Sequence, residues 1–480
     1  MNEKQIKRFE YLKQNYDLLS DQELQEYQML EAEYEASSPA ETTNGRSRKA
    51  SRAAREQVAA MEVAKEVRHK KIKKKKRKWP LILGLVVLAL LLIGGGVAAY
   101  MYTNATGILK KTFIQTDGTT NTIQADKPLT MVLLGVDTGD ASRGDSWEGN
   151  SDSQIVVTLN PKTKTTTMVS MERDTMTNII DGNGQTQSTQ KMNAAYPSGY
   201  NAGGLNGAVT YAMSTIGQES GIKLDNFMTL NMDGLVNLVN DVGGIDVVND
   251  SGSTITIANT EPEYTATVPY IGAGKSQHIN GDQALVFARD RDTLPNGDYG
   301  RTAHQREVIQ QVMKKLLSMN SLPNYEKILN DISHDFKTNI SINASNLTAL
   351  LAYKDCFNKV VSVQYQGISG TDDNGTSYQF MPQNVTLAVQ NLLRTSVGDS
   401  ALSQLGDNVI TYESYYGVGE DEMPNYFMPS ATITEKGKTP VTYGINTDGS
   451  LVNINSSNAS TYVGTNGSAV GTTSSSDDSQ

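Results

Sequence analysis

Cysteine and histidine are scarce in this chain of 480 residues, which contains one cysteine and four histidines. Because Cys356 has no second cysteine to pair with, an internal disulfide framework is excluded. The four histidines form neither an HExxH pattern nor another zinc-binding spacing, which argues against a zinc enzyme. The patterns GxSxG and GxxxxGK[ST] are also missing, so neither an α/β-hydrolase nor a P-loop nucleotide-binding protein is indicated.

One long run without charges, LILGLVVLALLLIGGGVAA, occupies residues 81–99. As a helix this run spans roughly 28 Å, close to the thickness of the membrane core. The basic run KKIKKKKRK at 70–78 precedes it, and the next basic residue after it is Lys110. Since positive residues stay on the cytoplasmic side, we expect a single-pass type II protein with everything after Tyr102 outside the cell.

The charge of the chain is divided at the same point. Residues 1–78 contain 19 basic and 13 acidic residues, so this part is positively charged. The remaining residues contain 23 basic and 39 acidic residues and give the whole chain its net charge of −10. The basic run next to the span favours anionic lipid over nucleic acid as its partner. A signal peptide is the rival interpretation, but the polar region before the apolar run is too long for one. A nearly cysteine-free outer portion predicts the cell membrane of a Gram-positive bacterium.

Composition predicts six segments. They are a partly disordered cytoplasmic arm at 1–78, a transmembrane helix at 79–102, an extracellular spacer at 103–126, a folded domain at 127–400, a C-terminal extension at 401–448, and a Ser/Thr/Gly-rich disordered tail at 449–480. The domain at 127–400 alternates runs typical of strands and of helices, which predicts an α/β fold with a central, mostly mixed sheet. Strands are expected at 129–136, 154–159, 165–171, 226–230, 245–248 and 360–365. Helices are expected at 204–216, 232–241, 281–288, 302–319, 324–332, 344–353 and 384–393.

Arginines and aspartates adjoin the ends of several of these elements. Examples are Asp137, Arg173, Asp174, Arg289, Arg291 and Arg301. Charges at the ends of buried elements often line a cleft, and guanidinium groups bind phosphate oxygens in pairs of hydrogen bonds. Carboxylates beside them would repel a phosphate unless a hard cation lies between, so oxygen-bound Mg²⁺ is implied. The alternative is a set of surface salt bridges.

Five ordered motifs carry a resemblance to the LytR-CpsA-Psr family. They are LLGVDTGD with SDSQIVVTLNPKTKTTTMVSMERDT, KMNAAYPSGY, NFMTLNMDGLVNLVNDVGGIDV, HINGDQALVFARDR and DYGRTAHQREVIQQV, over residues 129–318, with weaker likeness to 393. The resemblance implies an α/β/α sandwich with an apolar cleft for a polyprenyl chain. It also implies transfer of an anionic glycopolymer, such as teichoic acid or a capsular polysaccharide, from undecaprenyl pyrophosphate to peptidoglycan.

The resemblance also implies the site. It places Asp137 and Asp152 on Mg²⁺, makes these two with Arg173, Arg289 and Arg291 the catalytic set, and surrounds the pyrophosphate with Arg143, Arg173, Lys191, Arg289, Arg291, Arg301 and Gln305. Lys191 as a solvated loop residue and Gln305 as a helix-capping amide are the alternatives. Asp298 is either a base near the acceptor or a helix cap.

Two positions depart from the family pattern. Glu172 stands where the family usually has proline, and His304 stands where it often has arginine. The second departure predicts a weaker or pH-dependent phosphate contact. The apolar face of the helix at 302–319 is interpreted as core, with a lipid-lining role as the minority alternative. Three other functions stay open: a membrane-anchored regulator without enzymatic activity, a hydrolase of pyrophosphate-linked lipid, and an adhesion module.

Overall fold

The computed structural model describes residues 123–139, 147–294, 297–318, 331–340 and 352–464, together with single positions outside these ranges. The chain divides into two compact units, Met1–Lys78 and Trp79–Gln480. In the first unit, the described residues include a small apolar cluster of Phe9, Leu12, Tyr27 and Leu30. The predicted span at 81–99 lies outside the described residues. Among the helices that are described, none is long and apolar enough to cross a membrane.

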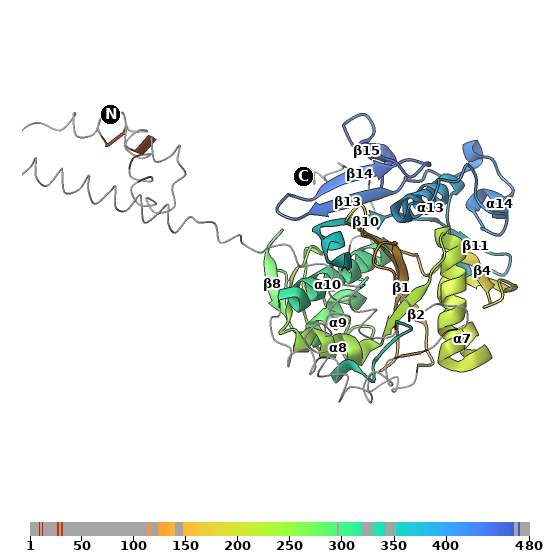
Figure 1. Cartoon of the computed structure of the whole chain (residues 1–480), viewed down its shortest axis with the longest axis horizontal. Coiled ribbons are helices and arrows are strands. Elements are labelled where there is room, and N and C mark those ends of the chain that lie inside the picture. The colour runs from red at the N-terminus through yellow and green to blue at the C-terminus, as the bar shows by residue number, and fades with distance from the viewer. Residues whose placement is uncertain are drawn as a thin grey trace, which may run out of the picture. The chain divides into compact units, whose positions relative to one another are not determined.

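A nine-stranded mixed sheet forms the centre of the second unit (Figure 1). Its strand order is β15-β14-β13-β10-β3-β2-β1-β6-β9. The bounds are β1 Leu129–Val136, β2 Ser151–Asn160, β3 Thr165–Ser170, β6 Asn226–Leu230, β9 Phe336–Thr338, β10 Lys359–Gln364, β13 Ser430–Glu435, β14 Val441–Ile445 and β15 Leu451–Asn453. β1 runs antiparallel to β2 and parallel to β6, and β10 runs parallel to β3. The mixed α/β fold predicted from the sequence is therefore confirmed.

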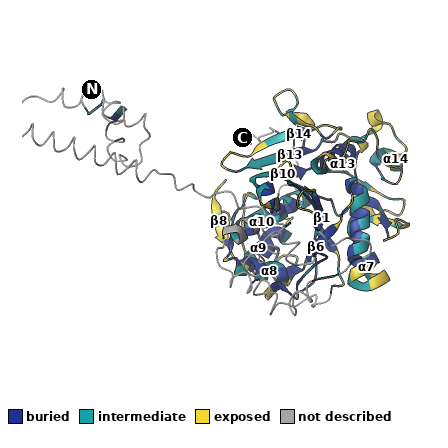
Figure 2. Cartoon of the chain, viewed as in Figure 1, coloured by how far each residue is buried: buried dark blue, intermediate teal, exposed yellow. Residues whose placement is uncertain are grey.

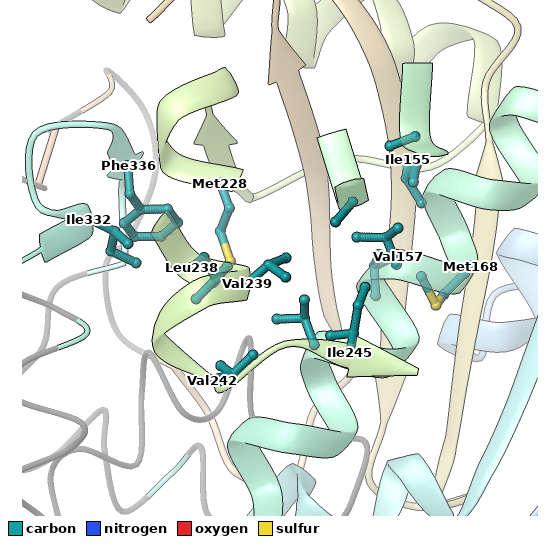
Figure 3. Close-up of a cluster of buried hydrophobic side chains, with 14 of the residues drawn as sticks. Ile155, Val157, Met168, Met228, Leu238, Val239, Val242, Ile245, Ile332 and Phe336 are labelled. Atoms are coloured by element: carbon teal, nitrogen blue, oxygen red, sulfur yellow. The ribbon is translucent and has the colours of Figure 1, made fainter. Parts of the chain in front are cut away.

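Helices pack on both faces of this sheet, because side chains along a strand alternate between its faces. In β1, Met131 belongs to one buried apolar cluster, whereas Val132 and Leu134 belong to another. The first cluster, part of which is drawn in Figure 3, includes side chains of α8 (Met232–Asp241), α9 (Gly281–Arg289) and α10 (Asp298–Ser318). The second includes side chains of α7 (Ala195–Ser220) and α13 (Gln383–Val397). Figure 2 shows that β1 and β6 are largely buried between these helices.

Local sequence explains where the helices beside β1 begin. The side chain of Asn231 accepts a hydrogen bond from the backbone of Gly234 and so caps α8. Asn280 and Gln283 form a reciprocal capping box at the start of α9. The helix α7 is interrupted at Gly203 and Gly204, where the backbone leaves the helical region. This break explains why the apolar periodicity predicts only a helix at 204–216.

Three two-stranded sheets lie outside the central sheet in the described part of the chain. They pair β4 (Met176–Ile180) with β5 (Thr186–Lys191), β7 (Ile245–Val248) with β8 (Ser276–Ile279), and β11 (Ile368–Thr371) with β12 (Ser377–Phe380). A short helix, α14 (Tyr412–Tyr416), and 3-10 helices at Met192–Ala194, Ala352–Asn358, Glu420–Glu422 and Ala459–Thr461 complete the described elements. The six predicted strands are all found, although the one at 245–248 pairs outside the central sheet.

The predicted helices at 204–216, 232–241, 281–288, 302–319 and 384–393 coincide with α7, α8, α9, α10 and α13. Most of the helices predicted at 324–332 and 344–353 lies outside the described residues. The C-terminal part differs from the expectation of an extension after residue 400 and a disordered tail from 449. β13, β14 and β15 continue the central sheet from β10, and Val463 is fully buried. These strands pair with β10 and with one another through their backbone, and their sequences SATITE, VTYGI and LVN are short.

Candidate active site

A cavity of about 510 Å³ lies where β1 ends and β2 begins, between the sheet and the helices α8, α9 and α10. Much of its wall is apolar: Met228, Leu238, Ile332 and Phe336, all labelled in Figure 3, are among its lining residues. Leu133, Leu230, Leu235, Ile257, Val308, Ile309 and Val312 add to this wall. The remaining lining residues include a group of charged side chains, so the cavity combines an apolar wall with a charged part.

Seven of the nine predicted site residues line this one cavity. They are Asp137, Asp152, Arg173, Arg289, Arg291, Arg301 and Gln305. Lys191 is not among the lining residues; its Nζ instead lies 2.9 Å from Oδ1 of Asp174. The prediction that Lys191 contacts the pyrophosphate is therefore not supported by its position. Arg143 lies outside the described residues.

Arg173 connects three carboxylates at the charged part of the cavity. Its Nη1 lies 2.8 Å from Oδ2 of Asp152, its Nε lies 3.5 Å from Oδ2 of Asp174, and its Nη2 lies 3.7 Å from Oδ1 of Asp298. Burial alone would lower the pKa of Arg173, but the surrounding carboxylates raise it above its ordinary value. Asp298 also lies 2.9 Å from Nη2 of Arg301. Asp298 thus holds two arginines in place, a role that was not among the two considered from the sequence, a base near the acceptor or a helix cap.

Asp152 and Asp137 are fixed by neighbouring amides. Burial alone would raise the pKa of Asp152, but Arg173, a hydrogen bond from Asn193 and the charge of Arg301 together lower it. The amide of Asn193 donates to Oδ1 of Asp152 at 3.0 Å, and the backbone N–H of Asn150 donates to Oδ1 of Asp137 at 2.6 Å. This approach requires the glycine at 149, because a Cβ there would lie 2.5 Å from the same Oδ1.

The two aspartates fit a hard cation in their donor chemistry. Both residues line the same cavity, and Mg²⁺ in phosphate-binding sites commonly takes one or two carboxylates while phosphates and water complete its shell. Within the described residues, no group of three or more His, Cys, Asp or Glu side chains is placed to hold a metal by itself. The protein part of the site would therefore supply two ligands and leave the others to substrate and water.

Glu172 lies buried behind the arginines and does not line the cavity. Burial, together with the charges of Asp298 and Asp174, raises the pKa of its carboxyl to about 8, although Arg301 opposes this. A carboxyl with this pKa is mostly protonated at pH 7. The departure from proline at this position therefore adds a titratable group next to Arg173.

His304 does not point into the cavity. Its Nε2 lies 2.9 Å from Oδ1 of Asp250, its Nδ1 lies 3.1 Å from the carbonyl oxygen of Phe287, and its ring stacks on that of Phe287 with 3.8 Å between centroids. The side chain joins α10 to α9 and to the loop after β7, and the weaker phosphate contact expected where the family often has arginine stays a prediction. Gln305, in contrast, lines the cavity and also donates to the carbonyl of Ala288 at 3.2 Å, which agrees with its capping alternative.

Arg289 is held by residues that the sequence analysis did not identify. Its Nη2 contacts both carboxylate oxygens of Glu261, at 2.7 and 2.6 Å, and its Nη1 lies 3.2 Å from the hydroxyl of Tyr264. The guanidinium also lies over the Tyr264 ring, 5.0 Å from its centroid. Because Glu261 comes from the irregular segment between β7 and β8, no spacing of residues in the sequence predicts its contact with Arg289. Arg291, by comparison, is 54% exposed.

Replacing Glu261 by glutamine is expected to tighten binding of inorganic pyrophosphate to the full-length chain by roughly three- to tenfold, because a carboxylate no longer competes for Arg289. Isothermal titration calorimetry of the detergent-solubilised protein measures this change. Glu263→Gln is the matched control, since Glu263 lies on the same segment and is exposed. Equal affinities of the Glu261→Gln variant and the wild type would show that Glu261 does not compete with anions at this site.

Comparisons with known proteins identify the family of the chain. The sequence model of the LytR_cpsA_psr family matches residues 97–395. Biofilm regulatory protein A of Streptococcus mutans is 39% identical over 347 residues, covering 71% of this chain and 82% of the relative. The polyisoprenyl-teichoic acid–peptidoglycan teichoic acid transferase TagU of Enterococcus faecalis is 34% identical over 327 residues, covering 68% and 98%. The crystal structure of protein gbs0355 from Streptococcus agalactiae has a TM-score of 0.55 at 43% identity, covering 62% and 97%. The chain belongs to the LytR-CpsA-Psr family.

Proposed function

We propose that the protein is a membrane-anchored phosphotransferase of a Gram-positive bacterium. It moves an anionic glycopolymer, a teichoic acid or a capsular or wall polysaccharide, from an undecaprenyl-pyrophosphate carrier to peptidoglycan. The observation that carries this proposal is the single cavity that joins an apolar wall to a group of arginines and aspartates. Such a cavity fits a donor with a long apolar tail and a pyrophosphate head. The name of the TagU relative from Enterococcus faecalis supports the same reaction.

In the proposed reaction, a hydroxyl oxygen of the acceptor forms a bond to the phosphorus that carries the polymer. The bond from this phosphorus to the bridging oxygen breaks, polyprenyl phosphate leaves, and the hydroxyl proton passes to solvent. Such a transfer depends mainly on positioning and on stabilising negative charge. Arg173 and Arg301 are placed for this task, because Asp152 and Asp298 fix their guanidinium groups at the cavity. Arg289 becomes available when the donor displaces Glu261.

We further propose Mg²⁺ as the cofactor, with Asp137 and Asp152 as its protein ligands. When bound, the ion neutralises part of the charge of the pyrophosphate. Oxygen ligands favour Mg²⁺ over zinc, and no described histidine or cysteine lines the cavity.

Transfer is expected in a reaction that contains the purified full-length chain, a short glycan on polyprenyl pyrophosphate, peptidoglycan oligomers and Mg²⁺. Chelation with EDTA should lower the initial rate at least about 100-fold, the size of effect expected when one electrostatic stabiliser is lost, and added Mg²⁺ should restore it. The product is measured as radiolabelled glycan attached to peptidoglycan. Full transfer in EDTA would contradict the metal proposal. Release of the glycan without attachment would instead indicate a hydrolase.

A regulatory function is the second candidate, and the name Biofilm regulatory protein A of the Streptococcus mutans relative favours it. A regulator would depend on the cytoplasmic arm that the sequence predicts at 1–78. Transfer by a variant that lacks residues 1–68 but keeps the predicted span therefore separates the two functions. Retained transfer supports the enzyme. An adhesion module, in turn, would not need the arginines of the cavity.

A further inference from the structure

Lys191 lies between the charged part of the cavity and a group of aromatic side chains. Its Nζ is 2.9 Å from Asp174, which itself contacts Arg173, and 6.0 Å from the centroid of the Tyr378 ring. A continuous series of contacts thus leads from Arg173 out of the cavity. The backbone strengthens this connection, because the N–H of Gln379 in β12 donates to the carbonyl of Asp174 at 2.9 Å.

Five aromatic residues form what is termed here the tyrosine cluster: Tyr378 and Phe380 of β12, and Tyr412, Tyr415 and Tyr416 of α14. The Phe380 ring lies 4.7 Å from that of Tyr415 and 5.1 Å from that of Tyr416, centroid to centroid. The Tyr416 side chain is 38% exposed. Figure 1 shows α14 and β11 on one side of the domain, close to β4, which leads into the strand that carries Lys191. The three tyrosines of α14 follow residue 395, where the family match ends.

The charges around the tyrosine cluster are mainly acidic. Asp372 and Asp373 lie close enough to Tyr415 to raise the pKa of its hydroxyl, after the effect of desolvation. Glu413 belongs to α14 itself. Carboxylates repel an anionic polymer, but they accept hydrogen bonds from sugar hydroxyls. An aromatic ring, in turn, packs against the apolar C–H face of a sugar. The cluster therefore fits an uncharged saccharide better than the anionic donor polymer.

We propose that the tyrosine cluster binds the acceptor saccharide, a glycan strand of peptidoglycan, and leads its hydroxyl toward Arg173. This inference rests on the proposed transferase function. The apolar wall of the cavity is then occupied by the lipid tail, so the acceptor has to approach from the surface beside the charged residues. Lys191, which lies over the buried Tyr378 ring, begins that surface, and Tyr416, which is 38% exposed, extends it outward.

Binding of the full-length chain, in detergent, to peptidoglycan sacculi stripped of anionic polymer tests this proposal. Tyr416→Ala and Tyr412→Ala should each weaken co-sedimentation about two- to tenfold, the size of one lost aromatic contact. Tyr270→Ala is the matched control, because Tyr270 is 39% exposed but lies in the segment before β8, apart from α14. Tyr416→Leu keeps apolar bulk against Phe380 and removes the ring, so it should show the same loss without a loss of folding.

A second measurement, binding of polyprenyl phosphate, separates the possible results. Weaker sacculus binding with unchanged lipid binding in the tyrosine variants supports the acceptor surface. Wild-type sacculus binding in Tyr416→Ala, Tyr416→Leu and Tyr412→Ala overturns it, as does binding only to walls that still carry anionic polymer. A parallel loss of lipid binding would also overturn it, since the cluster would then only support the fold. Failure of the wild type to bind the lipid would count against the proposed function alone, because sacculus binding is measured separately.

Discussion

Replacing Arg173 by lysine is expected to lower the rate of glycopolymer transfer by about 100-fold or more, the effect of losing one preorganised donor at a developing charge. The reason lies in its geometry. Three different nitrogen atoms of Arg173 face Asp152, Asp174 and Asp298. Lysine keeps the positive charge but concentrates it in a single ammonium group, which cannot face three carboxylates and a phosphate together. The lysine variant should therefore lose rate far more than stability.

The control for this variant is Arg394→Lys. Like Arg173, Arg394 makes contacts through more than one nitrogen atom: its Nε donates to the carbonyl of Ser400 and its Nη1 to that of Gly221. Unlike Arg173, it does not line the cavity. Transfer assays and thermal melts of both variants decide the outcome. Equal rates for Arg173→Lys and the wild type would exclude Arg173 from charge stabilisation. If the melting temperature of Arg173→Lys fell along with its transfer rate, the result would show that Arg173 has a structural role only.

The central strands could be predicted from sequence because their signal is local. β1 and β6 are short apolar runs next to turn residues, and both were predicted with the bounds that the structure shows. β13, β14 and β15 could not be predicted, because they owe their place to backbone pairing with β10. Their sequences SATITE, VTYGI and LVN are short, and the apolar alternation of the first two covers only a few residues, so pairing within the sheet fixes them as strands.

The candidate site divides in the same way. Asp137 and Arg173 follow buried strands and Arg289 ends the helix α9, and their shared cavity was predictable from the ends of those elements. Lys191 carried the same motif-based expectation, yet it lies outside the lining. Lys191 ends β5, and its side chain is placed by the ion pair that it forms with Asp174, which the motif does not predict. Glu261 shows the converse, because only the folding of the segment between β7 and β8 brings it to Arg289.

Stability should depend on pH through Glu172, and Glu172→Gln should remove this dependence. In the folded chain burial and the charges of Asp298 and Asp174 raise the pKa of Glu172 to about 8, against 4.5 for the unperturbed side chain. The folded state therefore holds a proton that the unfolded state has already lost between these values. Its stabilising contribution is complete below pH 4.5 and declines as the pH rises to about 8. The total decline is on the order of 3–5 kcal/mol.

A second buried carboxyl provides the internal comparison for this experiment. Burial raises the pKa of Glu219 to about 7, so most of its own contribution is lost by about that pH. The decline between pH 7 and 8 should therefore become much smaller in Glu172→Gln and largely persist in Glu219→Gln. Thermal melts of both variants and the wild type from pH 5 to 9 measure this difference. A decline between pH 7 and 8 that survives undiminished in Glu172→Gln would assign it to another group. Its reduction would show that this chain keeps an uncharged acid beside Arg173 at neutral pH, so that one fewer negative charge opposes a phosphate at the neighbouring arginines.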